Sequence, residues 1–290
     1  MTIPIKVFHA LGFGMLSLLT ALLAADTERA LVPDASTTNA ALGDALLSLS
    51  PLEFRARTYQ ETGYDMSNWS AEMSSASLTE FDFKNYLLHL WHPGAPRGAS
   101  CPRLERFGND GDGGKMVCNA EEVISRHEED CLIVSVGSNG DASFEETMRS
   151  FNPSCAVHIY DPSLSAEQIA NVPSWATFFN EPFNASTPER RYKGRRVAML
   201  KIDCEGCEFE ALPAWLEATA CTDLIIPEVH GCLSQHPGES VKARMRRFHG
   251  LMSTVEREGF KVYSSEVNLL AGSPTCVEYG LMREASCASR

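Results

Sequence analysis

Residues 132–141 read Leu-Ile-Val-Ser-Val-Gly-Ser-Asn-Gly-Asp, and the triplet Ile159-Tyr160-Asp161 follows further along the chain. An apolar run that ends in a glycine turn, and a second apolar run that ends in a carboxylate, predict a strand, a turn, a helix and a second strand. The two glycines let the backbone pass close to a ligand, and the helix that follows begins with free N–H groups. Asp161, at the tip of the second strand, can accept both hydroxyls of a ribose. The stretch therefore predicts a site for an adenosine-type cofactor.

The cofactor site is expected to use Gly137, Ser138, Gly140 and Asp141 from the turn, together with Asp161. The turn lacks the G-x-G-x-x-G spacing of the dinucleotide fingerprint, which counts against an NAD-type enzyme. A plain strand-to-helix turn is the alternative for the glycines. A turn or helix-cap residue before proline is the alternative for Asp161.

Two further strand ends carry groups suited to chemistry. One apolar strand runs directly into Asp203 and Glu205, and another ends in Pro-Glu228-Val-His230. Carboxylates at a strand tip are costly unless they meet a ligand, a cation or a proton-transfer task. Glu228 and His230 occupy alternate positions and so face the same side of their strand.

These four residues are predicted to be catalytic, with His230 as a general base for an acceptor hydroxyl. In the alternative interpretation His230 is structural and Glu205 and Glu208 merely favour the dipole of the helix that they precede. That interpretation suits Glu208 well and Asp203 poorly.

Turn residues alternate with apolar runs from Cys101 onward, which is typical of an α/β fold. Strands are predicted at 131–136, 156–160, 176–180, 196–202, 223–229, 260–264 and 277–281, and helices at 81–91, 143–150, 166–172, 208–219 and about 240–258. The Gly- and Asp-rich segment 106–118 is expected to fold over the cofactor cleft, with Lys115 reaching inward. Its spacing does not satisfy a calcium loop, and Cys204-x-x-Cys207 lacks a second ligand pair for zinc, so no metal site is predicted.

Composition limits the partners and the compartment. The 290-residue chain is 44% hydrophobic, has a formal net charge of -13 and a pI near 5.1, which argues against nucleic acid as a partner. Residues 1–25, with an apolar run over 7–25, predict a signal peptide or a signal anchor that could hold the protein to a membrane. Residues 26–80 are expected to form a poorly ordered stem or linker with one helix near 42–49, and 81–290 the globular domain.

The ten cysteines and two acceptor sequons suit an oxidising compartment. Cys101 and Cys118 flank the Gly/Asp-rich loop and are the best single disulfide pair, whereas Cys204 and Cys207 are expected to be buried small side chains or disulfide partners. Asn68-Trp-Ser and Asn184-Ala-Ser could carry glycans in the lumen. Together these features predict the secretory pathway, as an ER or Golgi membrane protein with a lumenal domain or as a secreted protein.

The motifs around Gly137, Asp161, the block Leu200-Lys-Ile-Asp-Cys-Glu-Gly-Cys-Glu208 and Pro227-Glu-Val-His230 together resemble the FkbM-type class I methyltransferases. The Asp-Gly-Gly-Lys115 loop with its trailing Cys118 looks more specifically like the eukaryotic methyltransferase-like proteins of the METTL group. The resemblance covers about residues 101–284. This chain departs from the pattern at Ser135, where many such enzymes have an acid, and at Cys204 and Cys207.

The resemblance implies a Rossmann-like α/β fold, with a mostly parallel seven-stranded sheet and helices on both faces. It also implies S-adenosylmethionine as cofactor, with Gly137, Ser138 and Asp141 on its methionine side and Asp161 at the ribose. The residues implied to face the acceptor are Asp203, Glu205, Glu228 and His230. O-methylation of a small-molecule or glycan hydroxyl is the expected activity. The alternatives are a catalytically silent methyltransferase-like binding domain and an NAD-type oxidoreductase.

Overall fold

The computed structural model describes residues 38–61, 77–94, 98–110, 113–127, 130–268, 273–284 and 287. Apart from Thr38, these residues belong to one compact unit over 39–290. Its strands are β1 (Leu104–Phe107), β2 (Lys115–Cys118), β3 (Leu132–Val136), β4 (Ala156–Tyr160), β5 (Ala176–Phe179), β6 (Arg196–Ile202), β7 (Cys221–His230), β8 (Phe260–Val267) and β9 (Cys276–Arg283). Its helices are α2 (Asn39–Ser48), α3 (Pro51–Glu61), α5 (Glu80–Leu90), α6 (Ala120–Ser125), α7 (Ser143–Phe151), α8 (Ala166–Ala170), α9 (Ser186–Tyr192), α10 (Glu208–Ala218) and α11 (Val241–Arg257).

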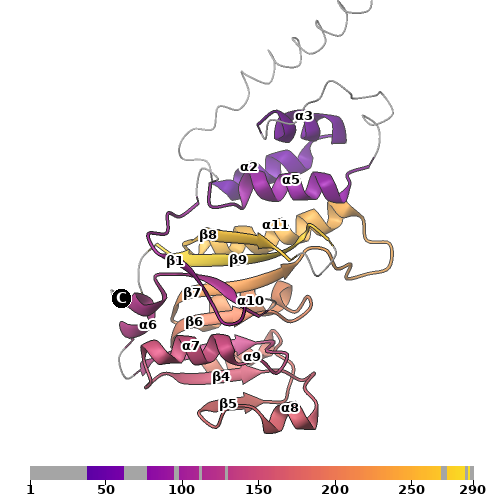
Figure 1. Cartoon of the computed structure of the whole chain (residues 1–290). Helices are drawn as coiled ribbons and strands as arrows, with labels where there is room; N and C mark the ends of the chain where they lie inside the picture. Colours follow the sequence, from indigo (N-terminus) through magenta and orange to yellow (C-terminus); the bar gives the residue numbers. More distant parts are fainter. Residues whose placement is uncertain are drawn as a thin grey trace, which may run out of the picture. The chain divides into compact units, whose positions relative to one another are not determined.

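A seven-stranded sheet forms the centre of this unit, in the order β5-β4-β3-β6-β7-β9-β8 (Figure 1). Neighbouring strands from β5 to β7 are parallel, and β9 lies antiparallel between β7 and β8. Strand order reverses between β3 and β6, so the loops at their carboxyl ends face each other at a topological switch point. The predicted class I methyltransferase fold is confirmed.

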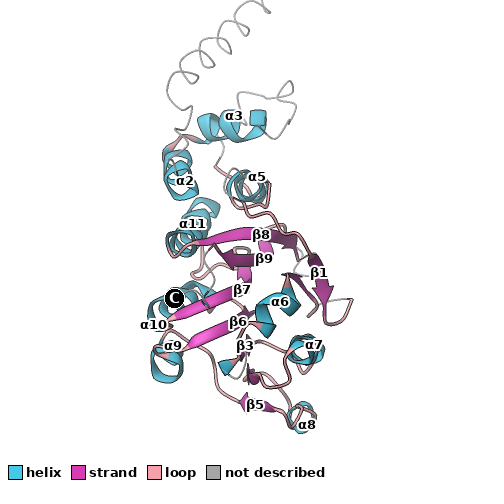
Figure 2. Cartoon of the chain, turned by 90° about the vertical axis from the view of Figure 1, so that its left-hand side faces the viewer, coloured by secondary structure: helices cyan, strands magenta, loops and turns pink. Residues whose placement is uncertain are grey.

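Helices cover both faces of the sheet (Figure 2). Helices α6 and α7 pack on one face over a core that contains Phe144 and Met148. Helices α9, α10 and α11 pack on the other face over a core that contains Trp215 and Phe248. Strands β3 and β7 are buried along their whole length and need no polar face, because helices cover both sides of the sheet there.

The predicted parallel strands are present, and two of them, Ala156–Tyr160 and Arg196–Ile202, have the predicted bounds. The segment 106–118 differs from the expected loop. It contributes to a separate antiparallel hairpin of β1 and β2. Strand β1 could not be predicted from hydrophobicity, because its side chains are mostly exposed and show no apolar alternation.

Helix α2 agrees with the helix predicted near 42–49, whereas α3 stands where the rest of the linker was expected. Leu46 and Phe54 are fully buried in the same core as α10 and α11. Residues 26–37 and 62–76 lie outside the described residues, as do the apolar run 7–25 and Asn68. Within the described ranges, no helix has both the length and the apolar character needed to cross a membrane.

All ten cysteines are paired in disulfides. The predicted Cys101–Cys118 bond is confirmed. The others are Cys131–Cys155, Cys204–Cys207, Cys221–Cys287 and Cys232–Cys276. Cys204 and Cys207 are thus disulfide partners, one of the two outcomes expected for them. This complete pairing is compatible with an extracellular or lumenal protein.

Candidate active site

The glycine turn after β3 meets the turn after β6 at the switch point. Gly137 has φ +77°, and a Cβ atom at this position would stand 1.8 Å from the carbonyl oxygen of Asp203. The Gly137 N–H donates to Tyr160 O (2.9 Å) and the Asp203 N–H to Val136 O (3.0 Å), which ties the two turns to the sheet. Only glycine permits this close approach of two backbones.

Asp161 lies directly after β4, as predicted, and it braces the glycine turn. Its Oδ2 accepts the N–H groups of Ser138 (2.9 Å) and Asn139 (2.8 Å). Its Oδ1 accepts the N–H (3.0 Å) and hydroxyl (2.6 Å) of Ser163. Burial would raise the pKa of Asp161, but these hydrogen bonds, those from Ser163 first, lower it on balance. A ribose hydroxyl would therefore have to displace the Ser163 hydroxyl at Oδ1.

A buried ionic group lies beneath the turn. Lys201 donates to the carbonyl oxygen of Gly137 (2.5 Å), and its Nζ lies 3.8 Å from Glu145 Oε1. Glu145 is fully buried and accepts a hydrogen bond from the Ser135 hydroxyl. A carboxylate from α7 is thus held against Ser135, one of the positions where the chain departs from the family pattern.

Asp141, expected on the methionine side, caps the start of α7. Its Oδ1 accepts the Ser143 N–H (2.9 Å), and its Oδ2 accepts from the Asn109 side chain of the β1–β2 hairpin. Burial would raise the pKa of Asp141, but the Ser143 and Asn109 hydrogen bonds lower it. The carboxylate is therefore ionised and suited to an ammonium group.

The four residues predicted to be catalytic come together at the carboxyl ends of β6 and β7. His230 Nε2 lies 3.5 Å from Glu205 Oε2, 3.7 Å from Glu228 Oε1 and 3.8 Å from Asp203 Oδ1. The side chains of His230 and Glu228 are 4% exposed, that of Asp203 is 23% exposed and that of Glu205 is 80% exposed. An acceptor approaching from solvent would meet Asp203 and Glu205 first.

Glu208 orients the imidazole, which corrects its interpretation as a simple helix-dipole residue. Its side chain is fully buried, its Oε1 accepts the His230 backbone N–H (2.8 Å) and lies 3.1 Å from Nδ1, and its Oε2 accepts the Gly206 N–H (3.0 Å). Burial would lower the pKa of His230, but the Glu208 hydrogen bond and charge, with Glu228 and Asp203, raise it to about 9. The imidazole is therefore protonated at neutral pH.

Lys115 reaches inward from β2, as expected, and meets carboxylates on three strands or their ends. Its Nζ pairs with Glu278, and lies 3.7 Å from Asp203 Oδ2 and 3.9 Å from Glu228 Oε2. Glu228 stands directly opposite Glu278 in the β7–β9 register. Burial first, then the charge of Asp203, raises the pKa of Glu228 to about 7, and burial raises the pKa of Glu278.

Four residues of this site were not predicted from the sequence as site residues: Lys201, Glu145, Glu208 and Glu278. The signal for Lys201 is its place in the Lys-Ile-Asp block, two residues before Asp203. No sequence spacing points to Glu278, because its position depends on how β9 inserts beside β7.

The comparisons with known proteins agree with this architecture. The family model described as a methyltransferase domain matches residues 84–179 and 181–283. The chain belongs to this methyltransferase family. No curated protein matches the chain. The resemblance to the FkbM-type and METTL subgroups stays a prediction.

Several solved structures are similar to this methyltransferase domain at low identity. A fibrillarin/Nop5p complex matches at 11% identity and TM-score 0.36, covering 54% of this chain and 74% of that chain. A Methanococcus jannaschii fibrillarin, a pre-rRNA processing protein, matches at 10% identity and TM-score 0.37, covering 55% of this chain and 68% of that chain. The precorrin-6y C5,15-methyltransferase from Geobacter metallireducens GS-15 matches at 12% identity and TM-score 0.33, covering 56% of this chain and 84% of that chain. The family match, and not these distant structures, assigns the domain.

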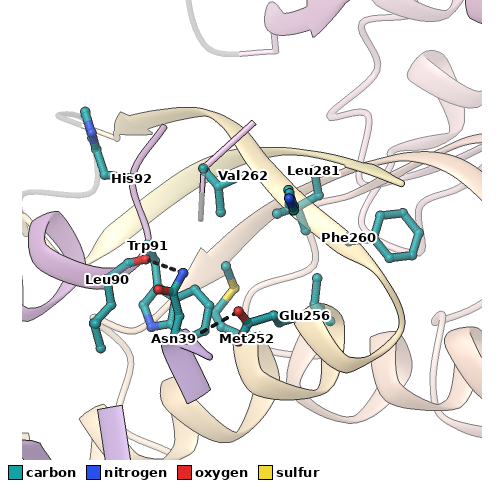
Figure 3. A pocket seen from close by; sticks show the side chains of 12 residues that line it. Asn39, Leu90, Trp91, His92, Met252, Glu256, Phe260, Val262 and Leu281 are labelled. Atoms are coloured by element: carbon teal, nitrogen blue, oxygen red, sulfur yellow. Dashed lines mark hydrogen bonds between the residues drawn. The ribbon is translucent and has the colours of Figure 1, made fainter. Parts of the chain in front are cut away.

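A small pocket of the methyltransferase domain lies away from this site (Figure 3). It is bounded by the start of α2, the ends of α5 and α11, and β8. Asn39 lines it. The Asn39 side-chain amide donates to Leu90 O (3.1 Å), and the Asn39 backbone N–H donates to Glu256 (3.1 Å). Its β9 residue is Leu281, which pairs with Ile225, whereas the cluster adjoins the Cys276–Glu278 end of β9.

Asp161→Ala is expected to weaken binding of S-adenosylmethionine by at least about 100-fold, or about 2.7 kcal/mol. It is also expected to lower the free energy of unfolding by about 1.5–3 kcal/mol, because buried N–H groups lose a charged acceptor. Calorimetry and denaturant unfolding measure the two effects. Ser163→Ala is the matched control, since it removes only the hydroxyl donor from Oδ1 and leaves the turn braced, so affinity should hold or rise. Unchanged affinity in Asp161→Ala would remove the ribose assignment.

Proposed function

We propose that this domain transfers the methyl group of S-adenosylmethionine to a hydroxyl of a small molecule or glycan in the secretory pathway. The observation that carries the proposal is the placement of two sites across the switch point of a class I methyltransferase sheet. The glycine turn and Asp161 lie on one side, and the carboxylate–imidazole cluster lies on the other. When bound, the cofactor supplies an activated methyl group on a sulfonium centre.

The residues on the cofactor side fit such a group. Gly137 and Gly140 have positive φ, and their lack of a Cβ lets the turn pack closely against Asp203 and Gln168. Asp161 is ionised and stands where a ribose would lie, and Asp141 offers a second carboxylate to an ammonium group. These residues would bind and orient the donor, which is most of what an in-line methyl transfer asks of an enzyme.

The acceptor side favours neutral molecules that carry hydroxyl groups. The cluster brings five carboxyl groups together, those of Asp203, Glu205, Glu208, Glu228 and Glu278, against the ammonium of Lys115 and the imidazole of His230. Carboxylates accept hydrogen bonds from hydroxyls and repel anionic acceptors. A neutral glycan or small alcohol suits this field better than a phosphate or a nucleic acid.

We infer a role for His230 other than the general base expected from the sequence, because its pKa is raised to about 9. A protonated imidazole presents an N–H donor, so at neutral pH it organises the acceptor site instead of removing a proton. Proton removal then falls to Asp203 and Glu205, the two carboxylates of the predicted set that reach solvent.

Calorimetry of the purified full chain with S-adenosylmethionine, with NAD titrated in parallel, tests the proposal. We expect binding of the methyl donor and none of NAD. A folded chain that binds neither would favour the catalytically silent binding domain, and binding of NAD alone would favour the oxidoreductase.

His230→Ala is expected to lower methyl transfer by about 100-fold or more, and to leave the dissociation constant of S-adenosylmethionine within about threefold. The loss should lie in the turnover number and in the acceptor KM, because His230 stands on the acceptor side. Formation of S-adenosylhomocysteine with an acceptor from a panel of neutral glycans measures it. His236→Ala, on the exposed loop after β7, is the control. Normal turnover in His230→Ala would exclude the residue from the reaction.

Asn184 is expected to carry a glycan if the domain enters the secretory pathway. The residue is exposed, and its Oδ1 accepts the Ser186 N–H (2.9 Å) and hydroxyl (2.8 Å). Peptide mass spectrometry of the chain from a secretory host, before and after glycosidase treatment, tests this. Asn184→Gln should lose the modification and Asn152→Gln, in a sequon blocked by proline, should not change it. An unmodified Asn184 in secreted protein would contradict the expectation.

A further inference from the structure

The cluster at the ends of β6 and β7 contains a set of groups suited to a metal ion, although the sequence predicts none. One oxygen each from Asp203 and Glu205 and the Nε2 of His230 lie within 4.8 Å of one another. A second set, Glu228, His230 and Cys276, is unsuitable because Cys276 forms a disulfide with Cys232 and offers no thiolate.

The imidazole gives the independent evidence that this is more than an acidic surface. The His230 side chain is 4% exposed, and its Nδ1 is held by Glu208. Its Nε2 makes no hydrogen bond to any described residue, and it lies within 4 Å of carboxylate oxygens of Asp203, Glu205 and Glu228. A histidine whose far nitrogen is fixed by a carboxylate, with the near nitrogen left open, has the arrangement found in metal-binding histidines.

The distances allow a cation between these atoms. Metal–oxygen bonds of about 2.1 Å place adjacent ligand atoms about 3 Å apart and opposite atoms about 4.2 Å apart. The Nε2 atom lies 3.8 Å from Asp203 Oδ1 and 3.5 Å from Glu205 Oε2, between these limits. Glu205 is 80% exposed and can adjust, and Lys115 occupies the other oxygen of Asp203, at 3.7 Å, so it leaves Oδ1 available.

We propose that Asp203, Glu205 and His230 bind a divalent cation with open coordination positions for an oxygen of the acceptor. The cation takes the place of the proton that His230 Nε2 carries in the metal-free protein, and this proton is released to solvent. Two carboxylates, one imidazole and no thiolate favour a cation such as Mn²⁺ over soft metals. The existence of the site does not depend on the proposed methyl transfer, but its use, to hold an acceptor hydroxyl beside the methyl donor, rests on that function.

The test is a titration of Mn²⁺ into the metal-free full chain, followed by electron paramagnetic resonance. We expect one bound Mn²⁺ per chain, with a nitrogen coupling from the imidazole that is absent in His230→Gln. Asp203→Asn and Glu205→Gln should each weaken binding by at least about 10-fold. Glu205 is exposed, so its variant keeps the fold, and Glu210→Gln, an exposed acid of the same segment, should bind within about twofold of the unaltered chain.

Three outcomes would overturn the site. They are a free Mn²⁺ signal unchanged by the protein, binding of Mn²⁺ by Asp203→Asn and Glu205→Gln that equals binding by the unaltered chain, or no nitrogen coupling. Calorimetry with S-adenosylmethionine in the presence of EDTA separates the two proposals. Binding of the methyl donor without Mn²⁺ binding refutes only the cation site. A chain that binds Mn²⁺ but does not bind the methyl donor supports the site and refutes the proposed function.

Discussion

Gly137→Ala is expected to abolish measurable binding of S-adenosylmethionine, a loss of at least about 100-fold. The new Cβ would stand 1.8 Å from the carbonyl oxygen of Asp203, so one of the two turns has to move. A residue with φ +77° adds about 1–3 kcal/mol of backbone strain when it carries a side chain. Movement of the turn also displaces the N–H groups of Ser138 and Asn139 from Asp161.

Gly194→Ala separates the strain from the contact. Gly194 also has a positive φ, +66°, but a Cβ there would meet nothing within 4 Å. This control should lose some stability and keep its affinity for the cofactor. Calorimetry and thermal unfolding of both variants give the comparison. Equal affinities would show that the approach of the turns after β3 and β6 does not shape the cofactor site.

The parallel part of the fold could be predicted because its signals are local. Strands β4 and β6 are short apolar runs bounded by turn residues, and each ends at a residue whose chemistry differs from the run before it, Asp161 or Asp203. The β1–β2 hairpin could not be predicted in this way, since β1 is exposed and the intervening segment resembles an irregular loop.

The acceptor cluster could be predicted only in part, for the same physical reason. Asp203, Glu205, Glu228 and His230 end strands that the sequence reveals, and parallel neighbours bring such ends to one edge. Glu278 enters from β9, whose antiparallel register beside β7 depends on contacts distant in sequence. Glu208 was misinterpreted because a first-turn acid usually faces solvent, whereas here it turns inward to His230.

Lys115→Met is expected to lower the free energy of unfolding by about 3–5 kcal/mol, because it removes one partner from a buried ionic group. Lys115 is 1% exposed and pairs with Glu278, and it lies within 4 Å of Asp203 and Glu228. Without its ammonium, Glu228 and Glu278 would face each other across β7 and β9 as uncompensated like charges. Denaturant unfolding measures the loss.

Adding Glu278→Gln to Lys115→Met should restore much of this stability, since the amide keeps the shape and removes a charge. Lys193→Met, at an exposed surface lysine, should leave stability unchanged.

The pH dependence gives the same interaction an independent test. A carboxyl group whose pKa is higher in the folded than in the unfolded state favours folding at low pH, and loses that contribution as pH rises through the folded value. The pKa of Glu228 is already raised to about 7 and that of Glu278 is raised, and removing Lys115 raises both further. Asp203 and His230 face the same carboxyl groups and are present in both proteins. The stability lost in Lys115→Met should therefore be smaller at about pH 5 than at about pH 8. A loss that is equal at both pH values would mean that Lys115 stabilises the domain by packing instead of by charge.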